Sequence, residues 1–93
     1  MLVLSWGPPH NPYQTAPDAF KALYQPEKIV LRPNVPAGEL SDKARVSLAG
    51  YYAHCSALDA CLGKLVQTLR ESGLEEDTLL VFGSDHGDMI QCQ

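Results

Sequence analysis

The chain has 93 residues, of which 45% are hydrophobic and 19% charged, and its 7 basic and 11 acidic side chains give a net charge of −4. This length and composition indicate one small globular domain at most, and they exclude an array of domains and a disordered, collagen-like or coiled-coil chain. Because the few basic residues are scattered, we expect neither nucleic acid nor an anionic membrane surface as the main partner.

The same residues predict no membrane span and no disulfide framework. The longest apolar run near the start is Met1 to Leu4, which is too short for a span and lacks the regions of a signal peptide. The cysteines, Cys55, Cys61 and Cys92, are odd in number and show no C-x-x-C spacing. We therefore expect neither a disulfide scaffold nor a zinc knuckle, and nothing here indicates a compartment.

The first elements expected are a strand and a long loop. Residues 1–6 contain the apolar run Leu2-Val3-Leu4 and predict a short buried strand, which ends at Gly7-Pro8-Pro9. Residues 7–40 are rich in proline, which blocks long helices and central strands alike, so we expect an irregular loop. Loops of this length inside compact domains are usually functional or disordered.

A long helix is predicted over residues 41–73. Ser41-Asp42 provides a side-chain cap and a negative charge for its first turn, and Gly73 provides the stop. Apolar side chains recur between these ends at steps of three and four, at Leu48, Tyr51, Cys55, Leu58, Cys61, Leu65 and Leu69. The interior glycines, Gly50 and Gly63, weaken a helix by about 1 kcal/mol each unless something packs closely there.

A second strand is predicted over residues 78–83. The run from Leu79 to Phe82 is apolar without alternation, as expected for a strand covered on both faces of a parallel sheet. Strand, crossover helix and strand form one right-handed βαβ unit. Since two strands under one helix leave bare edges, we expect an α/β fold, a βαβ slice of a larger sheet domain whose remainder, or a second copy, covers those edges.

The most informative local motif follows this second strand, in residues 84–93. Ligands of open α/β sheets gather at the carboxyl ends of strands, and Asp85 and His86 stand at that position. A carboxylate beside an imidazole suits a divalent cation such as Ca²⁺, Mn²⁺, Mg²⁺ or Zn²⁺. Gly87 permits a sharp turn, and Asp88 is placed to orient the imidazole. The alternative is an Asx turn with His86 in solvent.

A second imidazole, His10, follows the first predicted strand. The prolines on either side fix its backbone, which reduces the entropy lost when the ring is aimed at a ligand. His10 is suited to contact an anionic ester oxygen or to protonate a leaving group. The alternative is a proline-rich surface turn without function. Trp6 and Tyr13 would either wall a pocket or belong to the core.

For two polar residues of the predicted helix, His54 and Asp59, we expect structural roles. His54 has no carboxylate or second histidine four residues away, so we expect a packed or solvated histidine rather than a metal ligand. Asp59 lies in an apolar stretch, and we expect its carboxylate to find a hydrogen-bond partner.

Several motifs together resemble the sulfatase family, within the alkaline-phosphatase-like superfamily. They are, in order, Pro9-His10-Asn11-Pro12-Tyr13, Tyr51-Tyr52-Ala53, Leu58-Asp59, Leu62-Gly63-Lys64-Leu65, and Leu79 to Phe82 leading into Ser84-Asp85-His86-Gly87-Asp88-Met89. The resemblance implies that Asp85 and His86 are two ligands of a divalent metal, commonly calcium, with manganese or magnesium as the other choices. It also implies that His10 is a catalytic and substrate-binding residue that faces the sulfate ester.

Other parts of a sulfatase site are not found in these residues. The family's formylglycine is made from Cys or Ser in a C/S-x-P-x-R motif, which this sequence lacks, as it lacks the acidic pair and the substrate-binding lysine. We therefore expect a fragment of a sulfuric ester hydrolase that is inactive alone. The alternatives are a fragment of a phosphonate or phosphate monoester hydrolase of the same superfamily and a non-catalytic, truncated interaction module.

Overall fold

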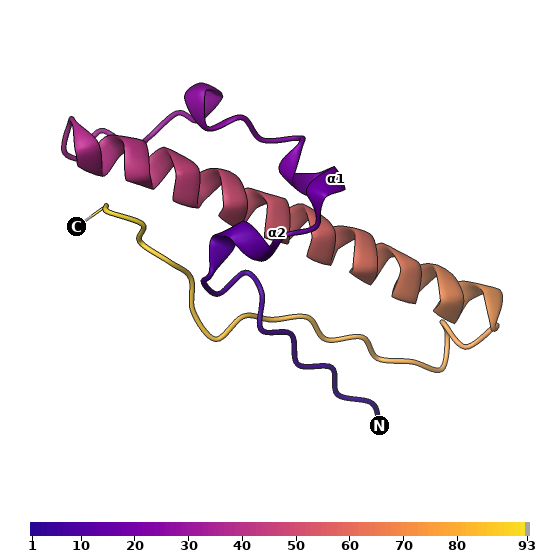
Figure 1. The fold of residues 1–93 in the computed structure, drawn as a ribbon. Helices are drawn as coiled ribbons and strands as arrows, with labels where there is room; N and C mark the ends of the chain where they lie inside the picture. Colours follow the sequence, from indigo (N-terminus) through magenta and orange to yellow (C-terminus); the bar gives the residue numbers. More distant parts are fainter. Residues whose placement is uncertain (93) are drawn as a thin grey trace.

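The computed structural model describes residues 1–92. Its helical elements are η1 (Tyr13–Thr15), α1 (Asp18–Lys21), η2 (Pro26–Lys28) and the long helix α2 (Glu39–Glu71). Residues 1–11 and 74–92 run along one flank of α2, in the direction opposite to that of the helix (Figure 1). No strand forms within residues 1–92, so the predicted α/β fold class, a βαβ slice, is wrong.

The two segments predicted as strands, 1–6 and 78–83, lack the paired neighbour that a strand needs. Strands are defined by hydrogen bonds between adjacent backbones, and no backbone hydrogen bond joins these two segments in the described part of the chain. Their apolar side chains are also not covered: Leu79 is 90% exposed and Val81 83%. The apolar pattern indicates side chains that suit a buried sheet, but it cannot supply the pairing and burial on which strand formation depends.

The start of α2 differs from the prediction. The helix covers Glu39–Glu71 rather than 41–73, and Gly38 precedes it with a φ of +93°, which is left-handed backbone. Ser41 lies inside the first turn, where its hydroxyl donates a 2.7 Å hydrogen bond to the Gly38 carbonyl oxygen. Ser41 therefore does not cap the free amides; the acidic side chain of Glu39 favours this end through the helix dipole.

The end of α2 is closed by Gly73. Its φ of +67° lies in the region that glycine adopts most easily. The Gly73 N–H donates to the Arg70 carbonyl at 3.0 Å, and the Leu74 N–H donates to the Leu69 carbonyl at 3.2 Å. These two bonds form a Schellman motif, which satisfies carbonyls that the helix end would otherwise leave unpaired.

The proline-rich segment wraps the N-terminal half of α2, and its three short helices all contact that helix. The residues buried between them are mostly small: Ala16, Ile29, Ala44, Ala49 and Ala53. At Gly50 the approach is closest, because a Cβ atom there would meet the Tyr13 carbonyl oxygen and lie 2.9 Å from its carbonyl carbon. The second interior glycine, Gly63, has open space around it.

Polar contacts fasten the same segment to α2. The hydroxyls of Tyr24 and Ser56 share a 2.7 Å hydrogen bond, and the Arg45 guanidinium donates to the Ile29 carbonyl. The fold thus consists of one long helix with a fastened segment over half of its length. None of the helices within residues 1–92 combines the length and apolar character that a membrane span requires.

Candidate functional site

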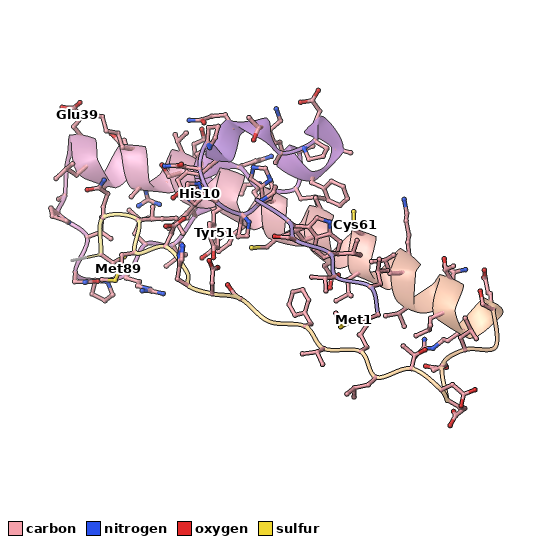
Figure 2. The ribbon with its side chains drawn as sticks, turned by 90° about the horizontal axis from the view of Figure 1, so that it is seen from below. Met1, His10, Glu39, Tyr51, Cys61 and Met89 are labelled. Carbon is pink, nitrogen blue, oxygen red and sulfur yellow. The ribbon has the colours of Figure 1, made fainter. Side chains whose placement is uncertain are left out.

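Two loops meet beside the middle of α2. One carries His10, and the other carries Asp85 and His86. The ring centroids of His10 and His86 are 6.5 Å apart, and the ring planes make an angle of 70°. Figure 2 shows His10 next to Tyr51, which projects from α2 at this point. The structure therefore brings together the three residues predicted from the sequence, although the sheet expected to carry them is absent from the described residues.

The His10 ring is held by its own loop. The His10 N–H closes a turn onto the Gly7 carbonyl at 3.1 Å. Its Nδ1 lies 2.8 Å from the Asn11 carbonyl oxygen, and since a carbonyl only accepts, Nδ1 carries the hydrogen. This leaves Nε2 for an outside group, where it accepts when the ring is neutral and donates when the ring is protonated.

The second loop orients His86 in the same way. His86 Nδ1 lies 3.1 Å from the Gly87 carbonyl oxygen, so this nitrogen also carries the hydrogen. The His86 backbone N–H donates to Asp85 Oδ1 at 3.0 Å, and His86 Nε2 lies 3.9 Å from Asp85 Oδ2. An imidazole lone pair and a carboxylate oxygen are thus adjacent, each supported by a neighbouring hydrogen bond.

This donor pair fits a divalent cation as part of its coordination shell. Backbone hydrogen bonding at Nδ1 of a histidine is the usual support for a metal bound at Nε2. Calcium takes six to eight oxygen-rich ligands, whereas no group of three or more His, Cys, Asp or Glu residues within 1–92 is arranged to hold a metal. Asp85 and His86 could supply two ligands, and a cation bound there would need further ligands from other groups.

A hydrogen bond between side chains joins the two loops. The Tyr13 hydroxyl donates to Asp88 Oδ2 at 2.8 Å. Partial burial, followed by this bond and the negative charge of Asp88, raises the pKa of Tyr13 to about 12. The Tyr13 ring packs edge-on against Tyr51, with centroids 6.1 Å apart, and burial is also the main cause of the raised pKa of Tyr51. Asp88, expected to orient the His86 imidazole, is therefore bonded to Tyr13 instead.

A second contact fastens the His10 loop to α2. The Thr15 hydroxyl donates to the Pro12 carbonyl at 2.8 Å, so it accepts from His54 Nε2, which lies 3.3 Å away. His54 is 4% exposed, and this bond makes it a buried anchor for the loop. Asp59 differs from its prediction: it lies on the exposed face of α2, where water can solvate its carboxylate.

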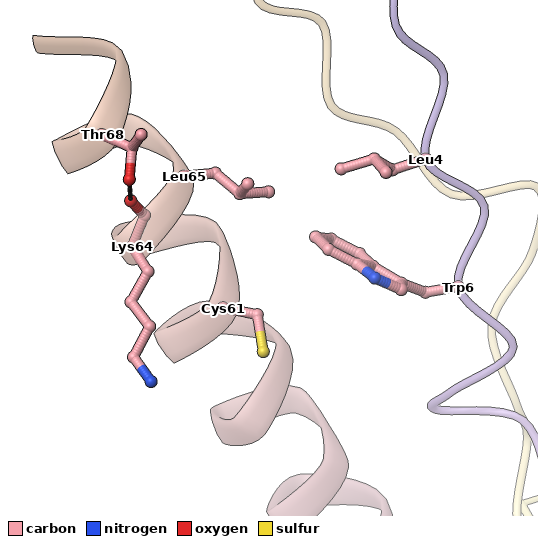
Figure 3. Close-up of a pocket in the computed structure, with 6 residues that line it drawn as sticks. All are labelled: Leu4, Trp6, Cys61, Lys64, Leu65 and Thr68. Carbon is pink, nitrogen blue, oxygen red and sulfur yellow. Dashed lines mark hydrogen bonds between the residues drawn. The ribbon is translucent and has the colours of Figure 1, made fainter. Parts of the chain in front are cut away.

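The site opens into a large cavity of about 1390 Å³, which His10, Asp85 and His86 line together with Tyr51 and the apolar face of α2. A smaller pocket of about 360 Å³ lies further along the helix. There, Leu4 and Trp6 face Cys61 and Leu65 across an open gap (Figure 3). No carboxylate or imidazole lines this smaller pocket, so the three site residues predicted from the sequence line the large cavity instead.

Comparison with known proteins assigns the family. The Sulfatase family profile matches residues 1–92. The chain is 41% identical over 90 residues to the ulvan-active sulfatase of Formosa agariphila, an alignment that covers 97% of this chain and 17% of that protein. It is 32% identical over 98 residues to an endo-4-O-sulfatase of Bacteroides thetaiotaomicron, covering 99% of this chain and 19% of the relative. The chain therefore belongs to the sulfatase family, and the resemblance seen in the sequence is confirmed.

A human relative extends the comparison. N-sulphoglucosamine sulphohydrolase of Homo sapiens is 35% identical over 74 residues, which make up 76% of this chain and 14% of that protein. The chain thus spans 14% to 19% of the length of these three relatives. No solved structure matches it.

Proposed function

We propose that this chain takes part in the hydrolysis of a sulfate ester, with His10 facing the ester and with Asp85 and His86 binding a divalent cation. The observation that carries the proposal is the 6.5 Å approach of the His10 and His86 rings at one cavity. Membership of the sulfatase family supports the ester class. The proposed cation is calcium, with manganese and magnesium as the other choices.

Each residue has a role that its contacts support. His10 presents Nε2 to the cavity, so in the protonated form it can donate a hydrogen bond to a sulfate oxygen or a proton to the leaving oxygen. Asp85 and His86 would hold the cation, which would supply positive charge for the sulfate oxygens. Formylglycine, which the family resemblance implies as the nucleophile, would come from another segment.

The remaining catalytic residues would come from the rest of a sulfatase catalytic domain. Alignments that cover 17% and 19% of two relatives leave most of their length outside the matched region. The apolar side chains of residues 78–83 are also exposed, including Phe82 at 64% and Leu79 at 90%. We therefore propose that the partner of these residues is the rest of the catalytic domain, and that the chain by itself has negligible turnover.

The test uses the protein encoded by the complete reading frame that contains this sequence, assayed with 4-nitrophenyl sulfate while Ca²⁺ is varied. We expect His10→Ala to lower kcat by about 100-fold or more, as loss of a general acid does. Asp85→Asn should raise the Ca²⁺ concentration for half-maximal activity by about tenfold or more, whereas the matched control Asp59→Asn, an exposed carboxylate of α2, should leave it unchanged.

Three outcomes would contradict parts of the proposal. Faster hydrolysis of 4-nitrophenyl phosphate than of the sulfate would favour the monoester hydrolase alternative. An unchanged Ca²⁺ requirement in both Asp85→Asn and His86→Ala would remove these residues from the metal site. Metal-dependent turnover by the 93-residue chain alone would contradict the claim that further residues are needed.

A further inference from the structure

We propose that Tyr13 and Asp88 are positioning residues, whose hydrogen bond holds the His10 loop against the loop of Asp85 and His86. This inference rests on the proposed function only for the roles of His10, Asp85 and His86. The contact itself is a property of this chain, so it can be tested without turnover.

The bond is the polar link between the two loops. Tyr13 follows His10 by three residues, and Asp88 follows His86 by two, so each partner belongs to the loop that it would position. The 2.8 Å bond spans 75 residues of sequence. Within residues 1–92, no other hydrogen bond or ion pair joins the segment before α2 to the segment after residue 76.

On one side of this bond, Tyr13 is fixed to α2. Its backbone lies against Gly50, its ring packs on Tyr51, and Thr15 is bonded to the buried His54. These contacts place the phenol on a rigid element, and a donor held in this way loses little conformational freedom when it bonds. Tyr13 therefore provides a fixed point beside the His10 ring.

On the other side, the loop of His86 makes no hydrogen bond or ion pair with α2 within the described residues. Asp85 and His86 bond within their own loop, to each other and to Gly87, and these bonds do not fix the loop relative to α2. Gly87 lies near the helix, since a Cβ atom there would be 3.9 Å from the Tyr51 hydroxyl. Among the polar contacts of the described residues, the bond between Asp88 and Tyr13 is thus the one that holds the two imidazoles at this distance.

The test measures the approach of the two imidazoles directly, in the 93-residue chain, by the nuclear Overhauser effect between the ring protons of His10 and His86. Tyr13→Phe removes the hydroxyl and keeps the ring, and Asp88→Leu removes the acceptor. We expect each to reduce the cross-peak at least fivefold while the circular dichroism of α2 is unchanged. Asp88→Asn retains an acceptor oxygen and should keep the cross-peak within twofold of the wild type.

The matched control is Tyr24→Phe. It removes a hydroxyl bond of similar length, from the same wrapping segment to Ser56 of α2, without touching the loops. We expect the cross-peak between His10 and His86 to remain in this variant. An undiminished cross-peak in both Tyr13→Phe and Asp88→Leu would overturn the proposal, as would an equal loss in Tyr24→Phe, which would indicate a general loosening of the segment.

A kinetic measurement on the protein from the complete reading frame separates positioning from stability. There, with the same aryl sulfate as substrate, Tyr13→Phe should lower kcat by about 10- to 100-fold with KM within about twofold, because small misplacement of reacting groups acts mainly on the chemical step. An unchanged kcat would overturn the positioning role. Absence of sulfatase activity in the wild type would instead refute the proposed function, while the cross-peak test would still decide the contact.

Discussion

The two interior glycines of α2 provide a matched pair for testing how the site is built. At Gly50 the backbone of Tyr13 occupies the space that a side chain would need, whereas a Cβ atom at Gly63 would meet nothing within 4 Å beyond its own helix backbone. Replacement of each by alanine makes the same chemical change in the same helix. The only intended difference is the presence of the His10 loop at the first position.

The magnitudes follow from two opposing effects. Alanine in place of glycine favours an exposed helix interior by about 1 kcal/mol, so Gly63→Ala should raise the free energy of unfolding by up to that amount. At Gly50 the same gain is opposed by overpacking, which typically costs about 1–3 kcal/mol. The gain in helix propensity is common to both variants. The free energies of unfolding of Gly63→Ala and Gly50→Ala should therefore differ by about 1–3 kcal/mol, which measures the cost of moving the Tyr13 backbone.

The assay is urea unfolding followed by circular dichroism at 222 nm, with the cross-peak between His10 and His86 recorded in parallel. We expect Gly63→Ala to unfold at higher urea than the wild type and to keep the cross-peak. Gly50→Ala should unfold at lower urea than Gly63→Ala and weaken the cross-peak, because Tyr13 carries the loop of His10. Equal stabilisation by both substitutions would refute the close approach at Gly50.

Three further predictions concern single contacts. The pKa of Tyr13 is raised from 10.0 to about 12, so the stability contributed by its protonated phenol is complete below pH 10 and is lost as the pH rises through 12. In Tyr13→Phe, absorbance at 295 nm should show one phenol fewer titrating near pH 12. Asp88→Asn should lower the pKa of Tyr13, because it removes the negative charge beside the phenol. Thr15→Val deprives the buried His54 of its partner and should lower the free energy of unfolding by about 1–3 kcal/mol in urea. Gly73→Ala forces a φ of +67° on an L residue, and it should cost about 1–2 kcal/mol and reduce the ellipticity of the last turn of α2.

The helix was predictable because its determinants are local. Its hydrogen bonds join residues four apart, so the apolar period and the stop at Gly73 lie within the segment that folds. Its first residue was less predictable, because serine is a residue type that often caps helices, whereas the Ser41 hydroxyl donates a hydrogen bond to the Gly38 carbonyl instead. The strands were not predictable from residues 1–6 and 78–83, since pairing is a property of two segments and no single run contains it.

For the candidate site, the sequence indicated His10, Asp85 and His86 but not the contacts that hold them in place. His10, Asp85 and His86 were indicated because each follows a predicted strand and because the motifs around them resemble those of the sulfatase family. The bond between Tyr13 and Asp88 has no signal in either segment, because its partners are separated by the whole of α2. The cost of an interior glycine suggested close packing at both Gly50 and Gly63, and the structure shows it at Gly50 alone of these two.

The unequal anchoring of the two loops has a consequence for cation binding. The loop of His10 is fixed to α2 through Gly50 and His54. Among the polar contacts of the described residues, the loop of Asp85 and His86 is joined to the loop of His10 through Asp88 alone. A cation that binds Asp85 and His86 must bring further ligands to a common centre, which requires one side of the site to adjust. The adjustable side would then be the loop of Asp85 and His86, the proposed metal ligands, while His10, which is proposed to face the ester, would stay in place. Binding of the cation should therefore move the His86 resonances more than those of His10.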